Sequence, residues 1–195
     1  MEEFAPVVKY VARHIQLTEE EEKYFVSLLR VIRVKKKQFI SQPDFICKYR
    51  NYIVQGAMRS YLADSNGQEH TISLCVEDWW ITDFNSYIHQ VPGTLYVEAL
   101  EPSTLIQIDH NAELLLMQTV PKFERFFRII TERSLAFLQK RMLSNFSKTA
   151  EERYLEYVEK YPSIASRVPQ YTRASYLGFS PEFLSKIRNN RIKKS

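Results

Sequence analysis

The sequence predicts an α+β protein in which an N-terminal antiparallel β-barrel or jelly roll precedes a long helix and a C-terminal helix-turn-helix domain. Three observations predict this order: strand-like runs between about residues 34 and 108, a helical stretch from Lys122 to Phe146 without Gly or Pro, and two short helices around Gly178. We therefore divide the chain into a barrel at 1–118, a long helix at 119–147 and a helix-turn-helix domain at 148–195.

The composition is that of a globular protein. The 195 residues are 45% hydrophobic, which is enough for a packed core, and the formal net charge is +4. No run of 18 apolar residues and no signal-peptide pattern is present, so we expect a cytoplasmic protein without membrane contact. Two scattered cysteines, Cys47 and Cys75, favour a reducing compartment but leave one disulfide open.

The first third of the chain combines two helices with short strands. Phe4 to Ile15 has amphipathic spacing, and Thr18 stands three residues before Glu21, which is the capping-box arrangement. Strands are expected at 50–56, 58–63, 70–76, 95–100 and 104–108. Asn66-Gly67 lies between two of these runs and predicts a tight hairpin.

The long helix from Lys122 to Phe146 carries too many apolar residues for one stripe. We therefore expect it to contact two surfaces, its own barrel and a twofold-related copy of the chain. A helix buried within a monomer is the alternative. The candidate dimer contacts are Phe123, Phe127, Ile130, Phe137 and Leu138.

The segment from Val168 to Arg188 predicts a helix-turn-helix. Gly178 ends the first helix, Ser180 caps the second, and Pro181 and Glu182 occupy its first turn. From Arg167 to the last residue the chain has seven basic residues and one acid. This basic end favours a polyanion partner over an ordinary helical hairpin. The candidate DNA contacts are Gln170, Tyr171, Thr172, Ser180, Pro181, Glu182, Ser185, Lys186, Arg188, Arg191 and Lys193.

Three blocks resemble the Crp/Fnr transcriptional regulators over nearly the whole chain. They are Tyr52-Ile53-Val54-Gln55-Gly56, Asn66-Gly67-Gln68-Glu69, and the run from Leu177 to Ile187. The resemblance implies a cyclic-nucleotide-binding-like barrel and a dimeric regulator. It places Glu182 and Lys186 on base-reading positions and Ser180 on a backbone-contacting position, whereas Arg173 stands where the family usually has an apolar residue.

The chain departs from this family at two places. Members that bind cyclic AMP hold its phosphate with a Gly-Glu pair and an Arg followed by a small hydroxyl residue, and only Thr94 matches here. Because a buried phosphate without a cation is costly, we expect the barrel not to be a classical cyclic AMP binder. The candidate effector residues are Arg59, Ile81, Thr82, Asp83, Gly93 and Thr94. Second, the few residues after the recognition helix predict a truncated or missing wing, with the basic end contacting phosphates instead.

The sequence favours no enzyme, catalytic residue, metal or cofactor. Its four histidines are scattered, and it has neither a phosphate-binding glycine loop nor clustered cysteines. We expect a homodimeric regulator of the Crp/Fnr type on double-stranded DNA, with a small-molecule effector and RNA polymerase as candidate partners. The alternative is a dimeric barrel that senses a small, cyclic-nucleotide-like molecule without sequence-specific DNA binding.

Overall fold

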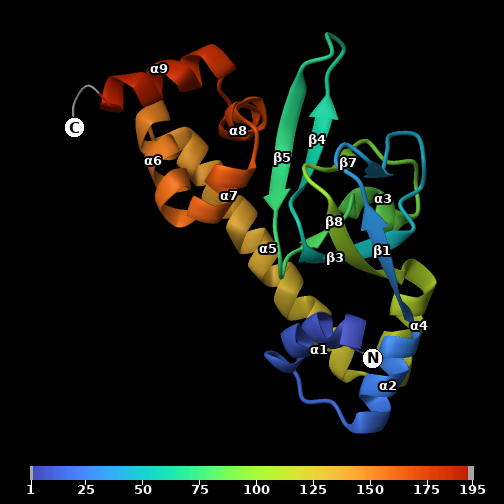
Figure 1. Ribbon diagram of the computed structural model, residues 1–195. Helices are drawn as coiled ribbons and strands as arrows, with labels where there is room; N and C mark the ends of the chain where they lie inside the picture. Colours follow the sequence, from blue (N-terminus) through green and yellow to red (C-terminus); the bar gives the residue numbers. More distant parts are fainter. Residues whose placement is uncertain (1, 193–195) are drawn as a thin grey trace.

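The computed structural model describes residues 2–192 and confirms the expected α+β architecture (Figure 1). A barrel of two four-stranded sheets is joined by a long helix to a small helical unit. The strands are β1 (Leu29–Val34), β2 (Phe39–Ser41), β3 (Tyr49–Gln55), β4 (Met58–Ala63), β5 (Glu69–Cys75), β6 (Trp80–Ile81), β7 (Tyr96–Ala99) and β8 (Ser103–Asp109). The helices are η1 (Glu2–Phe4), α1 (Ala5–Ala12), α2 (Glu19–Ser27), α3 (Phe84–His89), α4 (His110–Thr119), α5 (Lys122–Ser147), α6 (Ala150–Lys160), α7 (Pro162–Arg167), α8 (Gln170–Leu177) and α9 (Pro181–Ile192).

Both sheets are antiparallel. One has the strand order β1-β8-β3-β6 and the other β2-β7-β4-β5, so consecutive strands β3 and β4 belong to different sheets. The predicted hairpin joins β4 to β5, and Asp64 closes it by accepting the backbone N–H groups of Asn66 and Gln68 at 2.9 Å. Gly67 has φ +77° there, a conformation that glycine adopts without strain.

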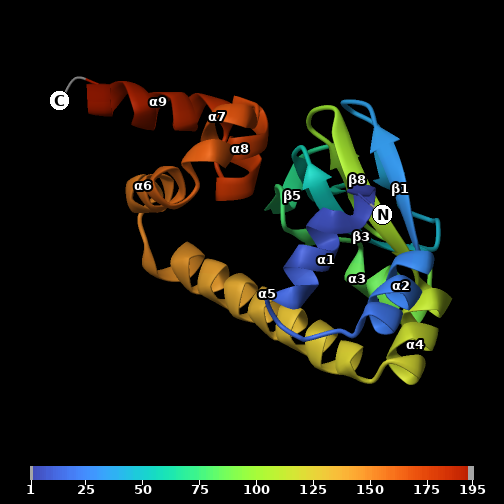
Figure 2. The same ribbon diagram turned by 60° about the horizontal axis from the view of Figure 1, so that its bottom comes forward.

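The N-terminal helices cover one end of the barrel and the first half of α5 (Figure 2). Buried residues of α1, α2, α4 and α5 form one cluster with those of β3 and β8, and Phe25 lies 4.7 Å from Phe123 between ring centroids. The Thr18 capping box is present: its hydroxyl accepts the Glu21 N–H while the Glu21 carboxylate accepts the Thr18 N–H.

Some elements differ from the sequence prediction. Strand β1 begins at Leu29, not near residue 34, because Leu29 pairs with Ile108 instead of continuing α2. Helices α3, α4 and α7 were not expected. Pro162 ends α6 as predicted, yet it also occupies the first position of α7, where a missing N–H is tolerated.

Cys47 and Cys75 are both buried and free. Within residues 2–192, no helix has the length and apolar character needed to cross a membrane.

Candidate DNA-binding unit and effector cavity

The helix-turn-helix forms from local signals in α8 and α9. Gly178 has φ +74° and ends α8, where the N–H of Phe179 donates to the Ala174 carbonyl at 2.8 Å. Ser180 Oγ then accepts the N–H of Phe183 at 3.2 Å, which caps the start of α9. Ala174, Leu177, Leu184 and Ile187 are buried between the helices, so the opposite face of α9 is exposed.

A polar brace fixes α9 against α8. Gln170 donates from Nε2 to Ser185 Oγ at 2.5 Å and to the Pro181 carbonyl at 3.2 Å, and its Oε1 accepts from Arg188 Nη1 at 3.0 Å. Four of the expected DNA contacts therefore bind one another in this conformation. Pro181, Glu182 and Lys186 are exposed on the first two turns of α9.

Two further expected DNA contacts lie on α8, and they differ in exposure. Thr172 is completely buried, so its side chain is unavailable to DNA in this conformation, which corrects that expectation. Tyr171 is partly exposed, and its ring lies 5.5 Å from the guanidinium carbon of Arg59. Arg191 falls in the last turn of α9, with its side chain outside the described part, and Lys193 lies outside the described residues altogether.

Arg173 of α8 connects this helix to the preceding helix α7. Its Nη1 donates to the Ala165 carbonyl at 2.9 Å, and the side chain is only half-buried. The long side chain reaches past the core to a polar group, so the position tolerates a charge.

A cavity of about 580 Å³ lies between the barrel, α1 and α5. Four of the six expected effector residues, Ile81, Thr82, Asp83 and Thr94, are among its lining residues. This volume is in the range of small-molecule sites, which usually span about 300–1,000 Å³.

Arg59 does not line this cavity, which corrects its expected place. The side chain is 2% exposed and lies on β4, where Nε donates to Glu98 Oε2 at 2.7 Å and Nη1 to Glu69 Oε2 at 2.5 Å. The Tyr61 ring lies 4.0 Å from its guanidinium carbon. Because its guanidinium already forms ion pairs with two carboxylates, Arg59 has no unpaired charge to offer a ligand.

Asp83 occupies a site of backbone donors. Its Oδ2 accepts the N–H groups of Thr94 and Leu95 at 3.0 and 3.1 Å, and its Oδ1 accepts that of Ser86 at the start of α3. Gly93 passes close by, since a Cβ there would lie 3.0 Å from Asp83 Oδ2. The Asp83 carboxylate thus already accepts the backbone N–H groups of the segment that, in the sequence, resembles a phosphate-binding stretch.

Arg50 is the buried cation in the cavity wall, and sequence reasoning missed it. It lies on β3, and its Nη2 is 2.7 Å from Glu113 Oε1, a carboxylate that also accepts from the Tyr87 hydroxyl. Four consecutive residues of β3, Arg50 to Ile53, are buried, so alternation gives no signal for this position. A charged residue in a strand also carries no signal of its partner on a helix 63 residues later.

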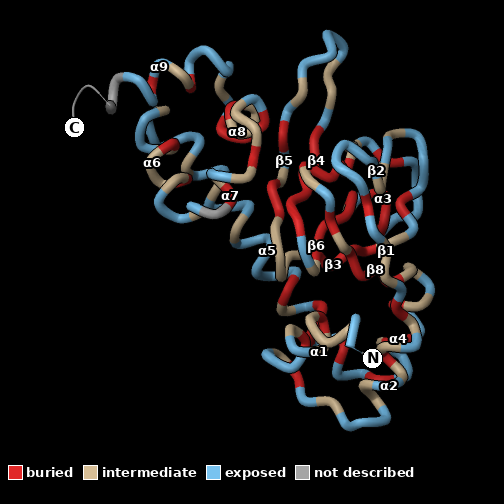
Figure 3. The backbone as a smooth tube through the Cα atoms, in the orientation of Figure 1, coloured by how far each residue is buried: buried red, intermediate tan, exposed pale blue. Residues whose placement is uncertain are grey.

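Helix α5 changes environment along its length (Figure 3). Phe123, Phe127 and Ile130 are buried in the chain's own core, so they are unavailable to a second copy, which corrects three expected dimer contacts. Phe137 packs edge-on against Trp79, and Leu138 is partly exposed at the cavity. An exposed apolar stripe occupies the second half of the helix; it comprises Leu135, Leu138, Met142, Leu143 and Phe146.

The helix-turn-helix unit is docked on its own barrel. Arg141 of α5 donates to the Thr71 carbonyl of β5 at 3.0 Å and to the Tyr176 carbonyl of α8 at 2.7 Å, and it also contacts the Ile72 carbonyl. Ser175 of α8 accepts the Thr71 N–H at 2.8 Å and donates to the Glu69 carbonyl at 2.7 Å. Leu74 joins the hydrophobic cluster of the helical unit.

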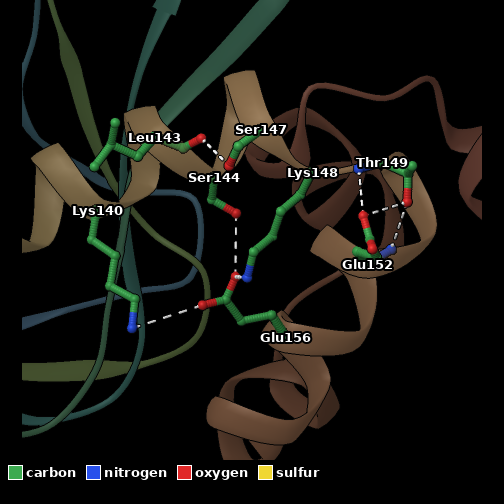
Figure 4. A network of polar contacts seen from close by, with 8 residues as sticks. All are labelled: Lys140, Leu143, Ser144, Ser147, Lys148, Thr149, Glu152 and Glu156. Carbon is green, nitrogen blue, oxygen red and sulfur yellow. Dashed lines mark hydrogen bonds and ion pairs between the residues drawn. The ribbon is translucent and has the colours of Figure 1, made fainter.

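The connection from α5 to α6 is braced by Glu156 (Figure 4). Its carboxylate accepts from Lys148 Nζ at 2.8 Å and Ser144 Oγ at 3.2 Å, with Lys140 Nζ at 3.9 Å. The hydrogen bond from Lys148 lowers the pKa of Glu156 below its usual value. Thr149 and Glu152 form a second capping box at the start of α6, as the Thr149 position predicted.

Neither a protein-family model nor a curated protein sequence matches this chain. Solved structures do. FixK2 from Bradyrhizobium japonicum has a TM-score of 0.74 at 18% identity, with 85% of each chain covered. The c-di-GMP-responsive global regulator CLP of Xanthomonas campestris has a TM-score of 0.74 at 12% identity, with 91% of this chain and 93% of that chain covered.

A third similar structure is a putative Crp/Fnr-family transcriptional regulator from Eubacterium rectale, with a TM-score of 0.71 at 15% identity over 91% of this chain and 85% of that chain. Cyclic-nucleotide-binding domains match the barrel as well. The three regulators match 85–91% of this chain, in agreement with the resemblance seen in the sequence. The chain therefore has the fold of the Crp/Fnr regulators, a cyclic-nucleotide-binding-type barrel followed by a long helix and a helix-turn-helix.

Proposed function

We propose that this protein is a dimeric, sequence-specific DNA-binding transcription regulator of the Crp/Fnr type. The observation that carries the proposal is the α8–Gly178–α9 unit, whose second helix is capped, packed on its inner face and exposed on its outer face. In a helix-turn-helix this outer face enters the major groove, and residues near the N-terminus of the second helix reach base edges. We assign 1–118 to the sensor, 119–147 to dimerisation and 148–195 to DNA.

Glu182 and Lys186 are the proposed base-reading residues. They lie four residues apart on the exposed face of α9. A glutamate accepts a hydrogen bond from cytosine N4, and a lysine donates to guanine O6 or N7. Ser180 and the basic end, including Arg191 and Lys193, are assigned to phosphates, which set affinity but not sequence preference.

The exposed stripe of α5 is the proposed dimer contact. Leu135 is 66% exposed and Phe146 is 83% exposed, so the second half of the helix presents an uncovered apolar surface. A second copy would cover it, and parallel packing of two such helices would place the two α9 helices on the same side of the dimer.

The cavity is the proposed effector site, in a form that does not take cyclic AMP. Asp83 already occupies the Thr94 and Leu95 N–H groups, and a phosphate brought beside this buried carboxylate would be repelled. RNA polymerase is a further candidate partner of such a regulator, and we propose that the protein acts in the cytoplasm.

The test measures DNA binding by fluorescence anisotropy, on an operator obtained by selection from random DNA and on the same operator scrambled. Lys186→Ala should cost on the order of 1–3 kcal/mol on the operator and little on scrambled DNA. Lys36→Ala, which removes an exposed lysine between β1 and β2, is the control and should leave both affinities unchanged. Lys193→Ala should weaken both DNAs alike. If Lys186→Ala also lowers both by one factor, α9 is not the reading helix.

A further inference from the structure

Three of the four charged side chains that line the cavity, among the described residues, are compensated within the chain. Among the described residues that line it, Arg50 and Arg133 are the cations and Asp78 and Asp83 the anions. Asp78 accepts from Arg13 Nη1 at 2.8 Å and from the Tyr52 hydroxyl at 2.5 Å. Asp83 accepts three backbone N–H groups. Neither carboxylate is left to bind a cationic ligand.

Arg50 is held in the same way. It pairs with Glu113, and both side chains are 7% exposed. Its guanidinium carbon also lies 4.9–5.4 Å from the ring centroids of Phe84, Tyr87 and Phe127. Its Nε and Nη1 make no hydrogen bond to the described residues, but both atoms are buried, so the surrounding wall would have to move before an anion could reach them. Arg133 is exposed at the rim.

The uncharged part of the wall is mostly aromatic and aliphatic, and it also contains seven neutral polar residues: Ser60, Ser73, Thr82, Asn85, Thr94, Thr131 and Ser134. Trp79, Trp80, Phe84 and Phe137 line the cavity together with Ile81 and Leu95. Burial raises the pKa of Cys75, another lining residue, to about 12, so its thiol is neutral at pH 7. Arg133 has no carboxylate partner among the described residues, but it lies exposed at the rim. A charged ligand placed inside the cavity would lose its hydration without gaining an unpaired counter-ion there, whereas an apolar ring would gain contact area.

We propose that the cavity binds a neutral, largely apolar ligand that contains an aromatic ring, and not a nucleotide or another anion. Only the role of this ligand as an effector rests on the proposed function; the ligand class does not. Because Leu138 belongs both to the cavity wall and to the exposed stripe of α5, occupation of the cavity reaches the proposed dimer contact directly.

Two dyes with one ring skeleton test the ligand class. N-phenyl-1-naphthylamine is neutral, and 8-anilino-1-naphthalenesulfonate adds only a sulfonate. The chain has two tryptophans, Trp79 and Trp80, and both line the cavity, so quenching of tryptophan emission reports binding there. We expect one neutral dye per chain, binding at least about tenfold more tightly than the sulfonate, and no displacement by cyclic AMP.

A variant of α5 shows where the dye binds. Ser134 lines the cavity and is exposed on the helix, so Ser134→Phe fills space without disturbing the core. It should weaken the neutral dye by about tenfold or more. Ala136→Phe adds the same ring to an exposed position outside the wall and should not change dye affinity.

Equal or tighter binding of the sulfonate would overturn the proposal and assign the cavity to anions at Arg50. Absence of binding by the neutral dye, or equal dye affinity in both variants, would overturn it as well. The titration uses the protein without DNA. A failure to select an operator therefore refutes the proposed function while this result stands, and a failed titration leaves the DNA result standing.

Discussion

Arg167 is the residue that ties the helical unit to the barrel by charge. Its Nη1 and Nη2 donate to the two oxygens of Glu77 at 2.9 and 2.8 Å, and its Nε donates to Glu101 at 3.1 Å. Glu77 also accepts the N–H of Gly56 at 2.8 Å. The bidentate geometry fixes orientation as well as distance, which a lysine could not do.

This contact predicts a pH dependence. The hydrogen bonds from Arg167 lower the pKa of Glu77 from 4.5 to about 2. A carboxylate with a depressed pKa in the folded state contributes stability that is complete above its unfolded pKa and is lost as the pH falls toward the folded one. The melting temperature of Glu77→Gln should therefore lie below that of the wild type at about pH 6, and the gap should narrow toward about pH 3. A gap of constant size across that range would show that the ion pair contributes nothing.

Single residues also show what the sequence can predict. Ser180, Gly178 and Thr18 lie where their local chemistry puts them, because caps and left-handed turns depend on a few neighbouring residues. Arg59 and Thr172 could not be placed in this way. Arg59 pairs with Glu98, which is 39 residues later in the chain, and the burial of Thr172 depends on how α8 packs in the folded protein.

Helix α5 belongs to three parts of the structure along its length. Its first half is part of the core, its middle forms a cavity wall, and its second half presents the exposed apolar stripe. The sequence predicted the helix and its contact with the chain's own core, since both follow from apolar periodicity. The contact of its exposed stripe with a second copy stays a prediction. The sequence did not predict which residues face which surface, because α1, α2 and α4 cover the first half and α4 was not expected.

The stripe predicts the effect of a charge on dimer formation. Met142→Glu places a carboxylate among apolar residues that would face a second copy, so the variant should sediment as a 23.2 kDa monomer at concentrations where the wild type is a dimer. Gln118→Glu adds the same charge to an exposed position of α4 and serves as the control. A wild-type monomer, or a Met142→Glu variant that still dimerises, contradicts the proposed contact.

For the whole molecule, the arrangement of its parts defines the proposed mechanism. Strand β5 contributes Ile72, Ser73 and Cys75 to the cavity, while its Thr71 binds Arg141 and Ser175 of the helical side. A ligand in the cavity and the orientation of α9 are thus connected through one strand. The order of the elements was predictable from the sequence. The docking of the helical unit on the barrel was not, because it depends on the packing of α8 against β5, which are far apart in the chain.

The central claim is that two copies of α9 read one DNA site as a symmetric pair. The most direct measurement is a hydroxyl-radical footprint of the wild-type protein on DNA selected from a random pool. The account predicts an inverted repeat with two protected half-sites whose centres lie about 34 Å apart, one helical turn of DNA. It also predicts that repeating the selection with Lys186→Ala relaxes the preference at one base pair in each half-site. A selection that enriches no sequence, or a footprint without twofold symmetry, would contradict the claim.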